Sequence, residues 1–265
     1  MRVAGKIVVV TGGARGIGEA MVRSFAKEGA AAIAVADMDL AAAGDLCREL
    51  TAGGVKATPF QVDISDEQQI KTLIDTVERD LGPIDLFCSN AGTGSGKGLD
   101  ATDADLTRNW TLNVVSHVYA ARHLVPRMVA RGGGYLLNTC SGAGLLANAD
   151  MPYMVTKHAA VAFADWLAIR YRAEGIKVSA LCPRGVKTTM LTQALAAGIP
   201  AAKAVMAGGD VLEPAAVADA VVKGLEAETF LILPHPDVGQ AIVRKASERD
   251  AWQGDIAKLF AGATA

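Results

Sequence analysis

Short, continuous apolar runs alternate along the chain with longer segments in which apolar residues recur at helical spacing. In the segment 70–81, for example, Ile70, Leu73, Ile74 and Val77 fall on one stripe of a helix. The continuous runs are typical of strands buried on both faces, as in a parallel sheet. Strands are predicted at residues 6–10, 32–36, 57–62, 84–88, 135–139, 178–181 and 230–233.

This alternation predicts the fold class. It favours an α/β architecture: a single-domain, Rossmann-like, doubly wound sheet of about seven parallel strands with helices on both faces. The length of 265 residues fits one domain over 1–265. Helices are predicted over 103–131 and 153–174, and one amphipathic helix over 238–260 within a C-terminal helical tail, 237–265, packed outside the core or on another subunit. Because ligands bind beyond the carboxyl ends of strands in such sheets, functional residues should follow the apolar runs.

Composition narrows the class of protein. The hydrophobic share of 51% and the charged share of 20% favour a large core and exclude intrinsic disorder. A net charge of −2 argues against a nucleic-acid partner bound through a basic face. No apolar run approaches the roughly 18 residues that span a membrane, and no secretion signal is evident, so we expect a cytoplasmic protein without a membrane partner. The four cysteines form no CxxC pair, so we expect neither a metal site nor disulfides.

A glycine-rich turn follows the first predicted strand. Residues 11–18 read Thr-Gly-Gly-Ala-Arg-Gly-Ile-Gly and lie between a strand and a helix. Glycines permit a tight turn and close approach of the backbone, and the helix N-terminus attracts a pyrophosphate. We therefore expect a dinucleotide cofactor to contact Gly12, Arg15, Gly16, Ile17 and Gly18.

An acidic residue after the second strand bears on the choice of cofactor. Asp37 lies roughly 20 residues beyond the glycines, where a carboxylate accepts hydrogen bonds from the adenosine ribose and repels a 2′-phosphate. Arg15 instead favours NADP, because its charge could pair with that phosphate. Because Asp37 is the stronger indication of the two, the sequence favours NAD over NADP. After the third strand, Asp63 and Ile64 are expected at the edge of the adenine ring.

Three further residues predict proton-transfer chemistry. Ser141 follows the fifth strand, Tyr153 lies twelve positions later, and Lys157 follows at i+4 on a predicted helix. Tyrosine and lysine therefore share one helix face. A free tyrosine has a pKa of about 10, and a neighbouring ammonium is expected to lower it toward the range of a general base. Ser141 is expected to hold the reacting oxygen of the substrate by a hydrogen bond.

In order and spacing, these motifs resemble those of the classical short-chain dehydrogenase/reductase family over residues 5–234. The resemblance implies a catalytic tetrad of Asn113, Ser141, Tyr153 and Lys157. In it, Lys157 also binds the nicotinamide ribose, and Asn113 holds a water that relays protons. Besides Tyr153 and Lys157, the resemblance implies cofactor contacts at Asp63, Ile64, Asn90, Ala91, Gly92, Pro183, Gly185, Val186 and Thr188.

The substrate site is expected beside Ser141 and Tyr153. The segment 189–212 occupies the position of the family's substrate lid, and its Ala-, Gly- and Met-rich composition suggests an apolar substrate. Its first residues, Met190 and Leu191, are expected to contact that substrate. Arg184 stands where the family commonly has glycine and is a further candidate contact.

The implied reaction interconverts a secondary alcohol and a ketone, with Tyr153 as general acid or base and a nicotinamide cofactor carrying the hydride. Two alternatives stay open: reduction of a 3-oxoacyl thioester of an acyl carrier, and binding of NAD by a regulator without catalysis. The resemblance also implies a homodimer or homotetramer. Five alanines on the long helices would allow close approach of a second subunit: Ala120, Ala121, Ala159, Ala160 and Ala162.

Overall fold

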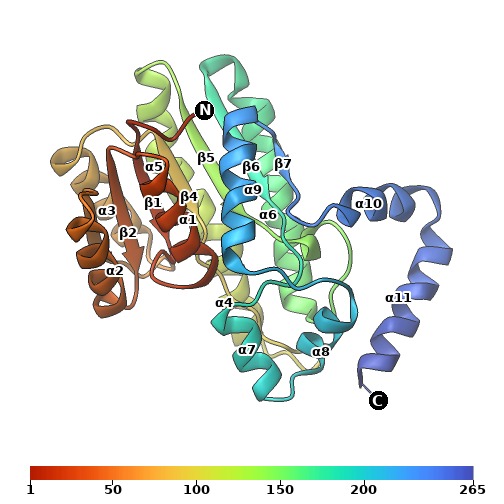
Figure 1. Cartoon of the computed structure of the whole chain (residues 1–265). Helices are drawn as coiled ribbons and strands as arrows, with labels where there is room; N and C mark the ends of the chain where they lie inside the picture. Colours follow the sequence, from red (N-terminus) through yellow and green to blue (C-terminus); the bar gives the residue numbers. More distant parts are fainter. Residues whose placement is uncertain (265) are drawn as a thin grey trace.

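Seven parallel strands form one sheet in the computed structural model, which describes residues 1–264 (Figure 1). The order along the sheet is β3-β2-β1-β4-β5-β6-β7. The strands are β1 (Ile7–Thr11), β2 (Ala32–Asp37), β3 (Ala57–Gln61), β4 (Leu86–Ser89), β5 (Gly134–Thr139), β6 (Ile176–Leu181) and β7 (Leu231–Ile232). The strand order changes direction between β1 and β4, and such a switch point is where doubly wound folds bind ligands.

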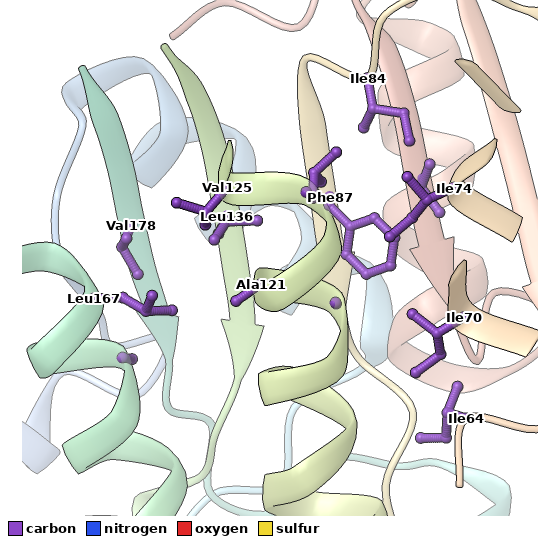
Figure 2. Close-up of a cluster of buried hydrophobic side chains, with 14 of the residues drawn as sticks. Ile64, Ile70, Ile74, Ile84, Phe87, Ala121, Val125, Leu136, Leu167 and Val178 are labelled. Atoms are coloured by element: carbon purple, nitrogen blue, oxygen red, sulfur yellow. The ribbon is translucent and has the colours of Figure 1, made fainter. Parts of the chain in front are cut away.

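Helices cover both faces of the sheet, because successive strand residues point to opposite sides. One layer contains α1 (Gly16–Lys27), α2 (Leu40–Ala52) and α9 (Pro214–Ala227), and the other contains α3 (Glu67–Asp80), α5 (Ser116–Ala130) and α6 (Met151–Arg170). Ile33 and Val35 of β2 pack in the first layer, whereas Ala34 and Ala36 pack in the second. Figure 2 shows the second layer, where aliphatic side chains and Phe87 fill the space between helices and strands.

The predicted fold class is confirmed: the chain forms a Rossmann-like, doubly wound parallel sheet. Each predicted strand overlaps an observed one, and their ends differ by at most two residues. β7 is the shortest of these strands, because only Leu231 and Ile232 pair with β6 at the edge of the sheet.

The helix predicted over residues 103–131 is not uniform. A π-helical turn, η1 (Thr111–Val115), joins α4 (Asp103–Trp110) to α5. A π turn accommodates an extra residue within a helix, and such turns are frequent at functional sites. The apolar pattern predicts a helix here but not the extra residue, which changes where Asn113 points.

The predicted lid and tail both contain helices beyond the sheet. In the lid, α7 (Thr189–Ala196) and α8 (Pro200–Ala207) lie near the carboxyl ends of the strands (Figure 1). The single helix predicted over 238–260 is wrong, because the chain turns at Glu248 between α10 (Asp237–Ser247) and α11 (Arg249–Thr264). α10 leads away from the sheet, and α11 packs against α8 (Figure 1). Residue 265, at which the predicted domain and tail end, lies outside the described residues.

The length and apolar character of the helices decide whether any of them could span a membrane. Within residues 1–264, no single helix is long and apolar enough to cross a membrane. α7 and α8 meet the criteria of length and composition only as a pair, and they are bent by 117° relative to each other. Ala201, Ala202 and Ala204 of α8 are buried against the rest of the protein.

Three of the alanines expected at a subunit contact lie in the core instead. Ala120, Ala121 and Ala160 are buried in the layer between the sheet and helices α5 and α6. Their small side chains let the helices approach the sheet, so the expectation is wrong for these positions. Ala162 is exposed on the outer side of α6, and Ala159 is half-buried.

Candidate active site

The glycine turn after β1 forms a cradle at the switch point of the sheet. Gly12 has a φ of +62°, and a Cβ there would lie 3.0 Å from the Ala91 Cα. A Cβ at Gly18 would lie 1.9 Å from the Gly12 carbonyl oxygen. Only glycine therefore lets α1 begin this close to the turn, at Gly16. The free N–H groups at the start of α1 can bind a phosphate.

Hydrogen bonds of Thr11 and Asn90 connect this turn to the neighbouring strands. The Asn90 amide donates to the Thr11 carbonyl oxygen at 3.0 Å and accepts from the Thr139 hydroxyl at 3.1 Å. The Thr11 hydroxyl accepts from the backbone N–H groups of Asn90 and Ala91 at 2.9 and 3.2 Å. Sequence reasoning identified Asn90 and Ala91 but missed the two threonines. Their position at strand ends was the only available signal.

Backbone donors fix the Asp37 carboxylate at the end of β2. Its oxygens accept from the backbone N–H groups of Ala14 at 3.1 Å and Asp39 at 3.0 Å. Arg15 forms an ion pair with Asp39. The Ala42 N–H and the Arg15 guanidinium hold the pKa of Asp39 below its usual value, so the pair is charged at neutral pH. The arginine that could attract a 2′-phosphate is thus already paired with an acid.

Two predicted cofactor residues lie beyond the end of β3, outside the lining of the main cavity. The Asp63 carboxylate accepts from the Ser65 backbone N–H at 2.8 Å and from its hydroxyl at 2.7 Å. Ile64 is buried in the core layer that contains α3. An adenine contact by these residues stays a prediction.

Tyr153 and Lys157 share one face of α6, as their spacing predicts, and Ser141 lies just after β5. The Lys157 ammonium nitrogen lies 5.6 Å from the centre of the Tyr153 ring. It donates a hydrogen bond to the Thr139 carbonyl oxygen at 2.8 Å. The Ser141 and Tyr153 side chains line the same cavity, and the Ser141 hydroxyl acts to lower the pKa of Tyr153. The structure therefore brings the three predicted catalytic side chains together.

Burial sets the protonation of this group. It raises the pKa of Tyr153 to about 12, against the lowering effect of the Ser141 hydroxyl, and it lowers the pKa of Lys157. The shift of the tyrosine pKa is opposite to the lowering expected from Lys157, because desolvation outweighs the effect of Ser141 and the acid Asp150 raises this pKa further. At neutral pH Tyr153 therefore carries a proton that it can donate.

The π-helical turn η1 directs the buried Asn113 side chain toward the loop after β4. Its Oδ1 accepts from the Thr93 N–H at 2.9 Å, and its Nδ2 donates to the Thr93 carbonyl oxygen at 2.8 Å and the Thr156 hydroxyl at 3.0 Å. A Cβ at Gly92 would lie 2.8 Å from the Asn113 Oδ1 and 3.4 Å from the Lys157 Nζ. Asn113 thus lies near Lys157 and holds the loop against α6, and its relay of protons stays a prediction.

Asp150 is a buried acid of the site that sequence reasoning missed. Its carboxylate accepts from the Ser95 N–H at 2.7 Å, the Ser95 hydroxyl at 2.9 Å and the Gly96 N–H at 2.5 Å. It also caps α6 by accepting from the Tyr153 N–H at 3.0 Å. One side chain therefore fixes both the loop after β4 and the start of the helix that carries Tyr153.

A main cavity of about 1130 Å³ connects these features with the lid and the tail. Its lining includes most of the predicted residues: Gly12, Arg15, Gly16, Ile17, Asp37, Asn90, Ala91, Gly92, Ser141, Tyr153, Lys157, Pro183, Arg184, Gly185, Val186, Thr188, Met190 and Leu191. Gly18, Asp63, Ile64 and Asn113 are not part of that lining. The tail was expected outside the core, yet α11 adds further apolar side chains to the cavity: Trp252, Ile256, Leu259 and Phe260.

Arg184 lines the cavity, but its guanidinium bonds to the protein itself. It forms an ion pair with Asp237 at the start of α10 and donates to the Gly208 carbonyl oxygen just after α8. The Arg184 backbone N–H also donates to the His235 ring at 3.2 Å. Arg184 therefore joins the end of the lid to the start of the tail, and a contact with substrate stays a prediction.

This arrangement was compared with known protein families. A family model described as short chain dehydrogenase matches residues 6–198. The chain belongs to this family. The short-chain dehydrogenase resembles 1-deoxy-11-beta-hydroxypentalenate dehydrogenase of Streptomyces exfoliatus at 35% identity over 238 residues, which cover 88% of this chain and 84% of the relative. It is 32% identical over 192 residues to 7alpha-hydroxysteroid dehydrogenase of Escherichia coli strain K12, covering 72% of this chain and 75% of the relative.

Solved structures of the family show the same architecture. A short chain dehydrogenase/reductase of Burkholderia phymatum in complex with NAD superposes with a TM-score of 0.86 at 26% identity, covering 95% of this chain and 96% of the other. A 7 alpha-hydroxysteroid dehydrogenase complexed with NADH and 7-oxo glycochenodeoxycholic acid gives a TM-score of 0.79 at 28% identity, covering 88% and 93%. The chain is therefore an oxidoreductase of the dehydrogenase/reductase type.

Proposed function

We propose that this short-chain dehydrogenase interconverts an apolar secondary alcohol and its ketone with NAD as cofactor. The observation that carries the proposal is the main cavity, which joins the glycine turn to Ser141, Tyr153 and Lys157. Beyond these three polar side chains, apolar residues of α7, α8 and α11 line the same space. Polar groups beside such an apolar wall suit the orientation of one hydroxyl or carbonyl on an apolar skeleton.

The residues of the cradle fit a dinucleotide. The tight turn that Gly12 and Gly18 permit would bring a pyrophosphate to the start of α1. Val186 and Thr188, which also line the cavity, would hold the nicotinamide end. When bound, the cofactor supplies hydride transfer, and the protein supplies position and electrostatics.

Charges at the end of β2 favour NAD over NADP. The Asp37 carboxylate would accept hydrogen bonds from the adenosine ribose and would repel a 2′-phosphate. Arg15 is paired with Asp39, so its charge is less available to such a phosphate. The relative from Burkholderia phymatum, solved in complex with NAD, agrees with this preference.

Tyr153 moves the proton of the reaction. Because its pKa is raised to about 12, the phenol is protonated at neutral pH and can donate its proton to the carbonyl oxygen of a ketone. In the direction of alcohol oxidation, the phenolate must form first, so that rate should rise with pH toward the pKa of Tyr153. Ser141 would orient the substrate oxygen, and the Lys157 ammonium would stabilise the phenolate.

The names of the relatives agree with an apolar substrate. The two relatives compared above are named as dehydrogenases of a hydroxypentalenate and of a hydroxysteroid. We propose a hydroxyl or keto group on a comparably apolar skeleton for this enzyme. The lid, 189–212, would cover that skeleton, with Met190 and Leu191 in contact with it.

The test is turnover of a panel of secondary alcohols and ketones, followed by the absorbance of the reduced nicotinamide, with NAD and NADP supplied separately. Tyr153→Phe removes only the hydroxyl, so kcat should fall at least about a hundredfold while binding of NADH persists. Tyr171→Phe, which removes a hydroxyl just beyond the end of α6, is the matched control and should keep its turnover. Full turnover by Tyr153→Phe would refute the proposed mechanism.

A further inference from the structure

A second cavity, of about 580 Å³, adjoins the main one between the loop after β5, α6 and helices α10 and α11. We call it the outer cavity. The residues that line both cavities are Leu146, Ala147, Trp252, Ile256 and Phe260. Because these shared residues are apolar, an apolar group could pass from one cavity to the other without leaving apolar surroundings.

Three basic side chains also line the outer cavity: His158 of α6, Lys245 of α10 and Arg249 of α11. The Lys245 ammonium donates to the carbonyl oxygens of Leu145 and Leu146 at 2.7 and 3.0 Å. It lies 3.3 Å from the His158 Nε2 and 5.4 Å from the centre of the Trp252 ring. The charge of Lys245 is thus held at the wall of the cavity by groups that carry no negative charge.

The histidine does not add to that charge. The His158 Nδ1 lies 2.9 Å from the Met154 carbonyl oxygen, which can only accept, so Nδ1 carries the proton of the ring. The Nε2 then accepts from the Lys245 ammonium. This pairing assigns a neutral ring, whose second nitrogen is already used by the lysine.

Neither cation of the outer cavity has an acidic partner within residues 1–264. No carboxylate there lies within 4.0 Å of Lys245 or of Arg249, whereas the neighbouring Arg244 pairs with Glu248 at 3.4 Å and Asp255 at 2.5 Å. Burial and the nearby Arg249 lower the pKa of Lys245, which is the sign of a cation without compensation. A cation beside an apolar surface is stabilised when an anion binds within ion-pairing distance of it.

We propose that the outer cavity binds the carboxylate of an apolar acid, with the anion between Lys245 and Arg249 and its hydrocarbon part against Trp252 and Ile256. The acid is either the far end of the substrate itself or a separate molecule. The first case rests on the proposed function and assigns the substrate to apolar hydroxy or keto acids, whose reacting oxygen lies at Tyr153. The position of α11 beside α8 would then select substrates by charge as well as by shape (Figure 1).

The kinetic test compares (ω−1)-hydroxy fatty acids of increasing chain length with their methyl esters. For each pair, the ratio of kcat/KM for the acid to that for the ester isolates the effect of the carboxylate. Arg249→Gln should lower this ratio about fivefold, and Arg249→Lys should restore it. Lys258→Gln, which removes the same charge from the same helix but outside the outer cavity, should leave the ratio at its wild-type value.

A binding test does not depend on turnover. Dodecanoate is titrated calorimetrically into the wild-type protein and the same variants, with dodecanol as the uncharged control. Binding that weakens in Arg249→Gln but not in Lys258→Gln supports the site even if no alcohol is oxidised, so failure of the proposed function would be recognised separately. If the kinetic ratio is unchanged while this binding difference holds, the acid is a separate molecule.

Two results would overturn the proposal. In the first, dodecanoate binds the wild-type protein no better than dodecanol does, and the kinetic ratio of Arg249→Gln equals that of the wild type. In the second, Arg249→Gln and Lys258→Gln change the kinetic ratio and the binding of dodecanoate equally. That result would indicate the general charge of α11 rather than a site. Because Lys245 also holds the loop after β5, Lys245→Met serves only as support, together with a measurement of its Tm.

Discussion

At the scale of single residues, Asp37 is the side chain on which the preference for NAD should depend. Asp37→Ala removes the carboxylate at the end of β2 and leaves Arg15 in place. The ratio of kcat/KM for NADP to that for NAD should rise about tenfold, because removal of one like charge relieves repulsion of roughly 1.4 kcal/mol. Steady-state kinetics with each cofactor measure this ratio.

The matched control for that change is Asp63→Ala, which removes the same charge at the end of the neighbouring strand. There the Asp63 carboxylate is bonded to Ser65 rather than to the turn that carries Arg15. The ratio of the two cofactors should stay close to the wild-type value. If Asp37→Ala also leaves it unmoved, another group distinguishes the cofactors.

The residues that could be predicted from sequence are those whose type and spacing are chemically informative. Tyr153 and Lys157 can be paired from their i, i+4 spacing alone, and the structure places the ammonium 5.6 Å from the ring. Thr11 and Asp150 act through backbone partners that lie far along the chain, as the bond from Ser95 to Asp150 shows. No local pattern contains such partners, so these two residues were missed.

At the scale of elements, one guanidinium connects the lid to the tail. Arg184 bonds both to Asp237 at the start of α10 and to the carbonyl oxygen of Gly208 after α8. Asp237→Asn should loosen this connection and raise the KM for substrate up to about fivefold, because partly exposed ion pairs contribute no more than about 1 kcal/mol. Steady-state kinetics at saturating cofactor, with hydrogen exchange over residues 200–212, would measure the effect.

Asp250→Asn makes the same change of charge on α11 and is the control for that experiment. It should alter neither the KM nor the exchange of the lid. Faster exchange over 200–212 in Asp237→Asn alone would tie the effect to the connection through Arg184. An unchanged KM and unchanged exchange in both variants would show that the ion pair does not hold the lid.

The existence of helices and strands follows from apolar periodicity, but their interruptions do not. The pattern over 103–131 is helical throughout, yet the chain forms the π turn Thr111–Val115 within it. That turn is supported by the bonds of Asn113 to Thr93 and Thr156, which are tertiary contacts. In the tail, helical spacing likewise continues across Glu248, where the chain turns to bring α11 onto α8.

At the scale of the whole molecule, the parallel sheet could be predicted because its strands are apolar without alternation. Each strand contributes side chains to both core layers, as Ile33 and Ala34 of β2 illustrate. The alternation with helices then requires crossovers of one hand, which leaves few arrangements of the strands. What the pattern does not contain is the covering of the main cavity by α11, since that depends on the tertiary contact of α11 with α8.

The outer face of α6 bears on the assembly of whole molecules. Its Val155, Trp166 and Ile169 are 52%, 53% and 80% exposed, and they form one stripe with Ala159 and Ala162 at helical spacing. The opposite face of α6 packs in the core, so this helix is apolar on two sides. An exposed apolar stripe of this kind is typical of a subunit contact, and we propose that it pairs two copies of the chain.

Ile169→Glu places a charge at the C-terminal end of that stripe, on a side chain that is 80% exposed. If two chains pair through α6, the variant should dissociate to a monomer at micromolar concentration, because an unpaired charge in an apolar contact costs several kcal/mol. Light scattering coupled to size-exclusion chromatography gives the mass of both proteins. Leu99→Glu, which charges an exposed apolar residue outside α6, should keep the wild-type mass. A wild-type protein that is already monomeric, or an Ile169→Glu variant of unchanged oligomeric mass, would rule out pairing through this face and leave the stripe without a role in assembly.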